Sequence, residues 1–202
     1  MTDVQAVARY FERVYPRRDG GGLARWFRAG EDERAAVVAP WLHGCCGARL
    51  LDVGTGDGVF LARVLGERPA EIWLVDLAPA NLAAAAARVA AQAQVVRTVV
   101  GDVDRLPLPR FDLVTAFGVT DYHRDWPRLI TRLAGLALRA VVVDVPRAGT
   151  ARALARRGWL AGHGLALATA RRDEVVAAAQ PHGRVELAAT RHHWILRIGR
   201  SP

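Results

Sequence analysis

Short apolar runs alternate with amphipathic or alanine-rich stretches along most of the chain. Runs typical of buried strands occur at residues 48–53, 71–77, 94–102, 111–119 and 139–146. The stretches between them have helical periodicity, and the one at 79–92 starts with proline, a residue favoured in the first helical turn. This alternation predicts an α/β fold with a parallel, doubly wound, Rossmann-like sheet that is covered by helices on both faces.

The two ends of the chain extend this pattern. Helical stretches are predicted at 3–15 and 31–43, before the first strand. After a predicted helix at 172–183, two strand-like runs at 184–192 and 193–199 follow with little between them, which indicates a terminal antiparallel hairpin.

No linker or internal repeat interrupts the chain, so we predict one domain over residues 1–202. Within it we expect an N-terminal helical lid (1–47), a ligand-binding core (48–145), a basic, glycine-punctuated segment that caps the substrate (146–172), and the closing helix and hairpin (173–202).

Composition narrows the functional classes. No stretch supplies the roughly 20 uncharged apolar residues of a membrane helix, and the N-terminus has no signal-peptide apolar core, so we expect a cytoplasmic protein without membrane contact. The net charge is +8, and all 28 basic residues are arginine. The arginines are spread along the chain, as in proteins from GC-rich genomes, so the charge does not predict nucleic-acid binding.

A glycine-rich turn follows the first predicted strand, in the sequence LLDVGTGDGVF (50–60). Gly54, Gly56 and Gly58 allow a tight turn and let a ligand lie against bare backbone. No Gly-Lys-Ser/Thr follows, as a phosphate-binding P-loop requires. A dinucleotide fingerprint requires glycine where Val59 stands.

Three carboxylates lie at the ends of the first three predicted strands. Asp52 precedes the glycines and suits a ligand with a positive amino group. Asp76 is placed to accept hydrogen bonds from a ribose diol, and Asp102 can accept one from the exocyclic amine of adenine, with Val103 beside the ring. S-adenosylmethionine has these three parts in this order.

These motifs resemble those of the class I S-adenosylmethionine-dependent methyltransferases. LLDVGTGDG, LVDLAPANL, GDVDRLPL and FDLVTAFGV are similar to the four family motifs, in order, within residues 48–145. The resemblance implies a mostly parallel seven-stranded sheet with a terminal hairpin, and S-adenosylhomocysteine as product. It also implies the following cofactor-binding residues: Asp52, Gly54, Thr55, Gly56, Gly58, Asp76, Leu77, Asp102, Val103, Phe117 and Gly118.

The methyl acceptor is expected to face the segment after the fourth strand, FGVTDYHRDW. This segment lacks the Asn/Asp-Pro-Pro-aromatic motif of nucleic-acid N-methylation. Tyr122 can orient an acceptor, and His123 can remove its proton, although positioning without a base can also suffice. Asp121 and Asp144 could imitate ligands of metal-dependent O-methyltransferases, but we predict no metal.

The N-terminal region resembles that of magnesium-protoporphyrin O-methyltransferases more weakly, through VARYFERVY and GLARWFR. The His-Tyr pair of that family is here inverted as Tyr122-His123. The resemblance implies that Tyr10 and Trp26 belong to a lid, with Tyr10 as a further catalytic candidate and Trp26 as a substrate contact. We do not transfer the porphyrin substrate.

We therefore expect methylation of an oxygen or nitrogen of a small molecule, as part of specialised metabolite biosynthesis. Two alternatives stay open: a ribosomal-RNA methyltransferase of the aminoglycoside-resistance type, and a non-catalytic, cofactor-binding partner protein. The sequence is compatible with a monomer or a homodimer.

Overall fold

The computed structural model describes residues 4–13 and 30–200. Seven strands form one sheet in the order β3-β2-β1-β4-β5-β7-β6, in which β7 is antiparallel to both of its neighbours. The predicted fold class, with its terminal antiparallel hairpin, is confirmed. The strands are β1 (Arg49–Val53), β2 (Glu71–Asp76), β3 (Val95–Val100), β4 (Phe111–Ala116), β5 (Ala137–Pro146), β6 (Arg184–Ala189) and β7 (His193–Gly199).

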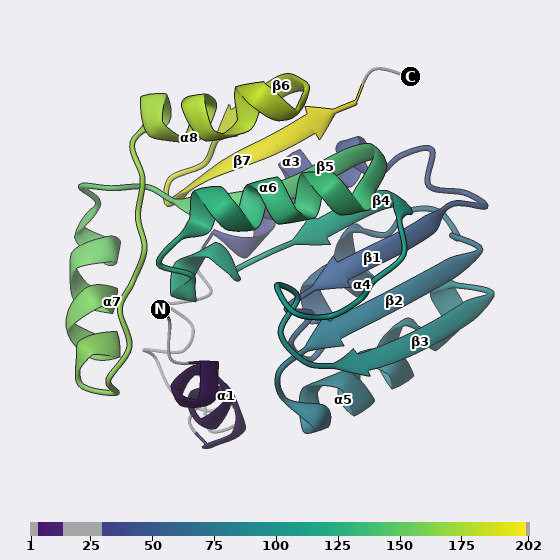
Figure 1. Ribbon diagram of the computed structural model, residues 1–202, viewed down its shortest axis with the longest axis horizontal. Helices are drawn as coiled ribbons and strands as arrows, with labels where there is room; N and C mark the ends of the chain where they lie inside the picture. Colours follow the sequence, from purple (N-terminus) through teal and green to yellow (C-terminus); the bar gives the residue numbers. More distant parts are fainter. Residues whose placement is uncertain (1–3, 14–29, 201–202) are drawn as a thin grey trace.

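Helices cover both faces of this sheet (Figure 1). One face carries α3 (Glu31–Trp41), α4 (Val59–Val64) and α5 (Pro79–Val89), and the other carries α6 (Trp126–Leu136) and α8 (Arg172–Ala179). Two more helices, α1 (Val4–Arg13) and α7 (Ala151–Ala161), lie on the side toward which the parallel strands point. Short 3-10 turns occupy residues 90–92, 120–122 and 180–182.

The central strands are apolar on both faces because both faces are covered. On β5, Val141 and Val143 pack in the cluster that contains Leu133 of α6. Val142, which points to the opposite face, packs in a second cluster with Val38 of α3. Consecutive apolar residues such as AVVV (140–143) are therefore what a central strand covered on both faces requires.

The segment at 147–172, to which the sequence analysis assigned no secondary structure, contains α7. Thr150 caps its first turn, since the Thr150 hydroxyl accepts a hydrogen bond from the Ala153 N–H at 3.1 Å. Tyr10 of α1 and Leu160 of α7 share a buried cluster with Tyr122, at the end of the sheet. The 147–172 segment therefore lies at the end of the sheet, where a substrate cap would lie. The division of the chain into lid, core and cap remains a prediction.

None of the helices in the described ranges is both long enough and apolar enough to cross a membrane. Trp26, the expected substrate contact, lies outside the described residues.

Candidate functional site

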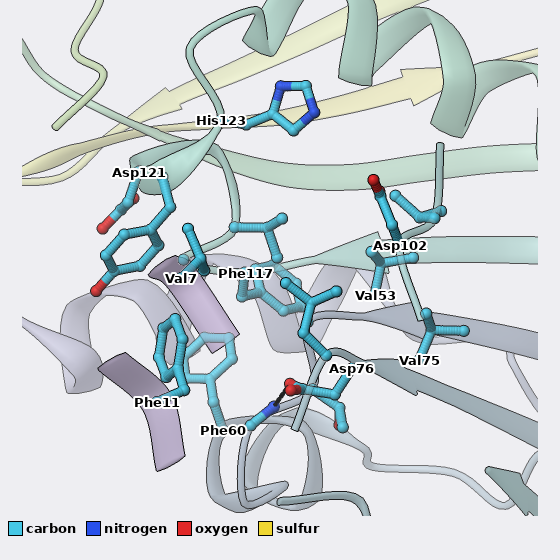
Figure 2. Close-up of a pocket in the computed structure, with 18 of the residues that line it drawn as sticks. Val7, Phe11, Val53, Phe60, Val75, Asp76, Asp102, Phe117, Asp121 and His123 are labelled. Atoms are coloured by element: carbon cyan, nitrogen blue, oxygen red, sulfur yellow. Dashed lines mark hydrogen bonds between the residues drawn. The ribbon is translucent and has the colours of Figure 1, made fainter. Parts of the chain in front are cut away.

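A cavity of about 660 Å³ opens at the carboxyl ends of the parallel strands. Its volume is within the range of roughly 300–1,000 Å³ that small-molecule sites occupy. Figure 2 shows Asp76 and Asp102 on one side, and Val7, Phe11 and Asp121 on the other. The two sides correspond to the predicted cofactor and acceptor regions, and open α/β sheets bind ligands at this edge.

The glycine loop forms the floor of the cofactor side. Gly54 has a φ of +66°, and a Cβ built there would lie 2.2 Å from the Cγ2 of Val119. Gly58 has a φ of +76°, and its Cβ would lie 2.8 Å from the Cα of Ala85 in α5. A side chain at either position would force the loop away from its neighbours. Gly56 instead lines the cavity, and a Cβ there would meet no atom within 4 Å, so its space is available to a ligand.

Asp76 ends β2 and holds this loop in place. One carboxylate oxygen accepts a hydrogen bond from the Gly56 N–H at 2.9 Å, and the other accepts one from the Ala78 N–H at 2.8 Å. Burial raises the pKa of Asp76, and these two hydrogen bonds oppose the rise. Each carboxylate oxygen keeps a second lone pair, so Asp76 can still accept hydrogen bonds from a ribose diol.

Asp52 lies beneath the loop rather than in the cavity wall. It is 3% exposed, and its Oδ1 accepts a hydrogen bond from the Thr115 hydroxyl at 2.6 Å. Burial raises the pKa of Asp52 to about 6, and the Thr115 hydrogen bond opposes this. The expected direct contact of Asp52 with the cofactor's amino group remains a prediction.

We expect Asp52→Asn to stabilise the protein against unfolding at pH 7. The pKa of Asp52 rises on folding, so the folded state binds this proton more tightly, and ionisation costs stability as the pH rises from about 4 to about 6. Asparagine carries no charge and can still accept from Thr115. Thermal unfolding should show the gain at pH 7 and its loss below about pH 4; a gain that is equal at both pH values would contradict the explanation.

Most of the other predicted cofactor residues line the cavity. Asp102 lies after β3, and Phe117 packs edge-on against Phe60 with ring centroids 4.8 Å apart. Gly58 does not line the cavity; instead it lets the loop lie close to Ala85 of α5. The predicted residues that line the cavity are Gly54, Thr55, Gly56, Asp76, Leu77, Asp102, Val103, Phe117, Gly118, Tyr122 and His123.

Tyr122 lies on the acceptor side, where its hydroxyl accepts a hydrogen bond from Arg156 Nη2 at 2.9 Å. Burial raises the pKa of Tyr122 to about 12, with the charge of Arg156 acting in the opposite direction. The hydroxyl is thus protonated at neutral pH and can donate to an acceptor. Tyr10 is buried behind the wall, where its hydroxyl accepts from Trp159 Nε1 at 3.3 Å; its catalytic role remains a prediction.

His123 forms a pair with an acid that the sequence analysis did not single out. Its Nε2 lies 3.2 Å from Asp104 Oδ2, and both residues line the cavity. Its Nδ1 is buried and has no hydrogen-bond partner among the described residues. If the ring proton is donated from Nε2 to Asp104, the lone pair of Nδ1 is left to accept a proton.

The acceptor side also contains two buried ion pairs, whose arginines the sequence analysis did not single out. Arg156 forms an ion pair with Asp121, and Arg34 forms one with Asp144 at 2.5 Å. These pairs join residues that are far apart in the sequence, so no local sequence motif predicts them. Asp144, considered above as a metal ligand, is thus engaged by a guanidinium. The described residues contain no group of three or more His, Cys, Asp or Glu side chains placed to hold a metal. His193 also lines the cavity.

The polar groups on the cofactor side match the hydrogen-bonding groups of S-adenosylmethionine. Gly56 offers open backbone, while Asp76 and Asp102 offer acceptors for hydroxyl and amine groups at neighbouring strand ends.

Comparison with known proteins agrees with this geometry. A family model described as a methyltransferase domain matches residues 50–139. The ubiquinone/menaquinone biosynthesis C-methyltransferase UbiE of Bordetella parapertussis is 35% identical over a region that covers 59% of this chain and 48% of the relative. The chain therefore spans about half the length of the curated relatives it matches.

Solved structures share the whole fold. The magnesium protoporphyrin IX methyltransferase ChlM of Synechocystis PCC 6803, with bound SAH, superposes with a TM-score of 0.76 at 21% identity, over 98% of this chain and 100% of that one. The N-methyltransferase NodS of Bradyrhizobium japonicum WM9, in complex with SAH, gives 0.67 at 15% identity, with 100% of both chains covered. A methyltransferase-domain model thus matches residues 50–139, and the sheet order and the glycine loop are those expected of the class I S-adenosylmethionine-dependent methyltransferases.

Proposed function

We propose that this protein transfers a methyl group from S-adenosylmethionine to an oxygen or nitrogen of a small molecule. The observation that carries the proposal is the two-sided cavity, in which the polar cofactor side continues into a region lined by apolar and aromatic side chains. Val7 and Phe11 of α1 face this region, and Phe11 packs edge-on against Tyr122 at 5.1 Å between ring centroids. A concave region with aromatic side chains in its wall suits a small acceptor better than a folded nucleic acid.

Bound S-adenosylmethionine supplies a methyl group on a positively charged sulfur. With the cofactor held by the glycine loop and Asp76, the acceptor's lone pair would bond to the methyl carbon, and the electron pair of the broken carbon–sulfur bond would remain on sulfur. Tyr122, protonated at neutral pH, would hold the acceptor by a hydrogen bond and by its ring. His123, whose ring Asp104 holds through Nε2, would be the candidate to take up the acceptor's proton.

We expect His123→Ala to lower kcat by about 100-fold, the lower end of what a positioned base contributes. The affinity for S-adenosylhomocysteine should stay within a few-fold, because the glycine loop and Asp76 are unchanged. His43→Ala provides the control, since His43 is exposed and does not line the cavity. An unchanged kcat in His123→Ala would show that positioning alone suffices.

The experiment that tests the proposed function is transfer of radiolabelled methyl from S-adenosylmethionine. Purified protein is offered a small-molecule extract of the producing cells and, separately, ribosomal subunits at low and high salt. Label in the small-molecule fraction alone is the expected result, and would justify a search for the specialised metabolite that is modified. Salt-sensitive label in ribosomal RNA would overturn the proposal, and binding of cofactor without transfer to either would favour a non-catalytic partner protein.

A further inference from the structure

The outer edge of β3 is apolar and open. This strand ends the sheet order and, within the described residues, pairs with β2 alone; it is the lowest strand of the sheet in Figure 1. Its sequence is VVRTVV, and the side chains at its two ends, Val95 and Val100, are 44% and 53% exposed. An open apolar edge can pair with a further strand, so proteins usually protect such edges with charged side chains.

Arg97, the one charged residue in the sequence of β3, does not protect this edge. Its Nε donates a hydrogen bond to Glu71 at 2.5 Å, and its guanidinium lies over the Trp73 ring, 5.7 Å from the centroid. Glu71 and Trp73 both belong to β2. The side chain of Arg97 is thus held over the neighbouring strand, on the side away from the open edge, and its charge is balanced within its own sheet.

The backbone of β3 presents a regular set of hydrogen-bonding groups to the open side. The Val95 N–H donates to the carbonyl of Ala70, the residue before β2, at 3.1 Å. The backbone groups of successive residues point alternately to the two sides of a strand. The N–H and C=O groups that point away from β2 are therefore those of Val96, Thr98 and Val100.

A two-fold axis through Thr98 pairs all of these groups with a second copy of the strand. In an antiparallel pair about this axis, Thr98 lies opposite the partner's Thr98, and Val96 lies opposite the partner's Val100. The two residues of each such pair exchange both of their backbone hydrogen bonds, and a Thr–Thr pair adds to sheet stability. No like charges lie opposite each other in this register, whereas an axis through Arg97 would oppose two arginines.

Helix α5 lies beside β3 and extends the apolar edge on one face of the sheet. Arg88 Nε donates to the carbonyl of Asp57 in the glycine loop at 3.0 Å. Because this loop follows β1, on the far side of β2 from β3, the opposite flank of α5 faces the open edge. Helical periodicity places Ala83, Ala86 and Ala90 on that flank. Such short, uncharged side chains allow two α5 helices to approach to the roughly 8–10 Å of packed helices.

We propose that the chain forms a homodimer by antiparallel pairing of two β3 strands, with Thr98 on the two-fold axis. The alanine flanks of the two α5 helices pack against each other and enlarge the interface beyond the two strands. The two seven-stranded sheets join into one continuous sheet, which removes the open apolar edge. This assembly goes beyond the proposed function and does not depend on the identity of the acceptor.

Sedimentation equilibrium at micromolar protein concentration tests the assembly. We expect wild-type protein to have twice the 21.9 kDa mass of the chain. Thr98→Arg places two like charges face to face on the axis and should give a 21.9 kDa monomer, with its fold checked by circular dichroism, since Thr98 is exposed. Ala189→Arg is the matched control: it adds the same side chain at an exposed position of β6, the opposite edge strand, and should remain dimeric.

An exchange of charges tests the register. Thr98→Glu should be monomeric on its own, but an equimolar mixture of Thr98→Glu and Thr98→Arg should form a heterodimer, because opposite charges then face each other across the axis. Wild-type protein that stays monomeric, or a dimer that survives Thr98→Arg, would overturn the proposal. A mixture of the two folded variants that does not associate would overturn the placement of Thr98 on the axis.

Discussion

Replacing Asp144 with alanine is expected to destabilise the fold by about 3–5 kcal/mol, the cost of leaving a buried charge without its partner. Asp144 is fully buried at the carboxyl end of β5. One of its carboxylate oxygens pairs with Arg34 at 2.5 Å, and the other accepts a hydrogen bond from the Gly118 N–H at 2.7 Å. The substitution removes both interactions. It leaves the guanidinium of Arg34, whose side chain is only 12% exposed, without the carboxylate of Asp144.

Urea unfolding followed by circular dichroism measures this loss. Asp32→Ala is the matched control, since it also breaks an ion pair with an arginine, but one whose carboxylate is 86% exposed, so we expect a cost of at most about 1 kcal/mol. Combining Asp144→Ala with Arg34→Met removes the stranded charge and should recover part of the stability. If Asp144→Ala costs no more than the control, the buried ion pair does not stabilise the acceptor end as described.

Replacing Asp76 with alanine is expected to weaken binding of S-adenosylhomocysteine by about 100-fold or more. Two hydrogen bonds from ribose hydroxyls to a charged acceptor would be lost, each worth about 1.5–3 kcal/mol. The glycine loop would also lose the carboxylate that accepts from the N–H groups of Gly56 and Ala78. The effect should appear in calorimetric titration, with the secondary structure checked by circular dichroism.

Two further variants control the Asp76 result. Asp76→Asn keeps one oxygen acceptor without the charge and should give an intermediate affinity. Asp173→Ala removes an exposed acid from the first turn of α8, away from the cavity, and should bind as wild type does. An Asp76→Ala protein that is folded and binds S-adenosylhomocysteine at full strength would place the ribose elsewhere.

The sequence was sufficient to predict the sheet and the cofactor side of the cavity because both are encoded locally. A strand that is covered on both faces needs apolar side chains at consecutive positions, as in AVVV (140–143), and the three glycines of the loop lie within residues 54–58. The carboxyl ends of parallel strands then bring Asp76 and Asp102 together without any knowledge of tertiary packing.

The acceptor side could not be predicted in the same way. Its ion pairs connect Arg34 with Asp144, 110 positions apart, and Arg156 of α7 with Asp121, which precedes both α6 and β5 in the sequence. In a chain whose 28 basic residues are all arginine, no single arginine stands out. Helix α7 was missed because the glycines in and around it hid its periodicity, although Thr150 provided a usable capping signal.

Calorimetric titration of the wild-type protein with S-adenosylhomocysteine decides whether the cavity is a cofactor site. We expect one molecule to bind per chain with a micromolar dissociation constant, in the cavity beside Gly56 and Asp76. An absence of binding at millimolar concentration, to a protein shown to be folded, would contradict the assignment of this cavity as a cofactor site.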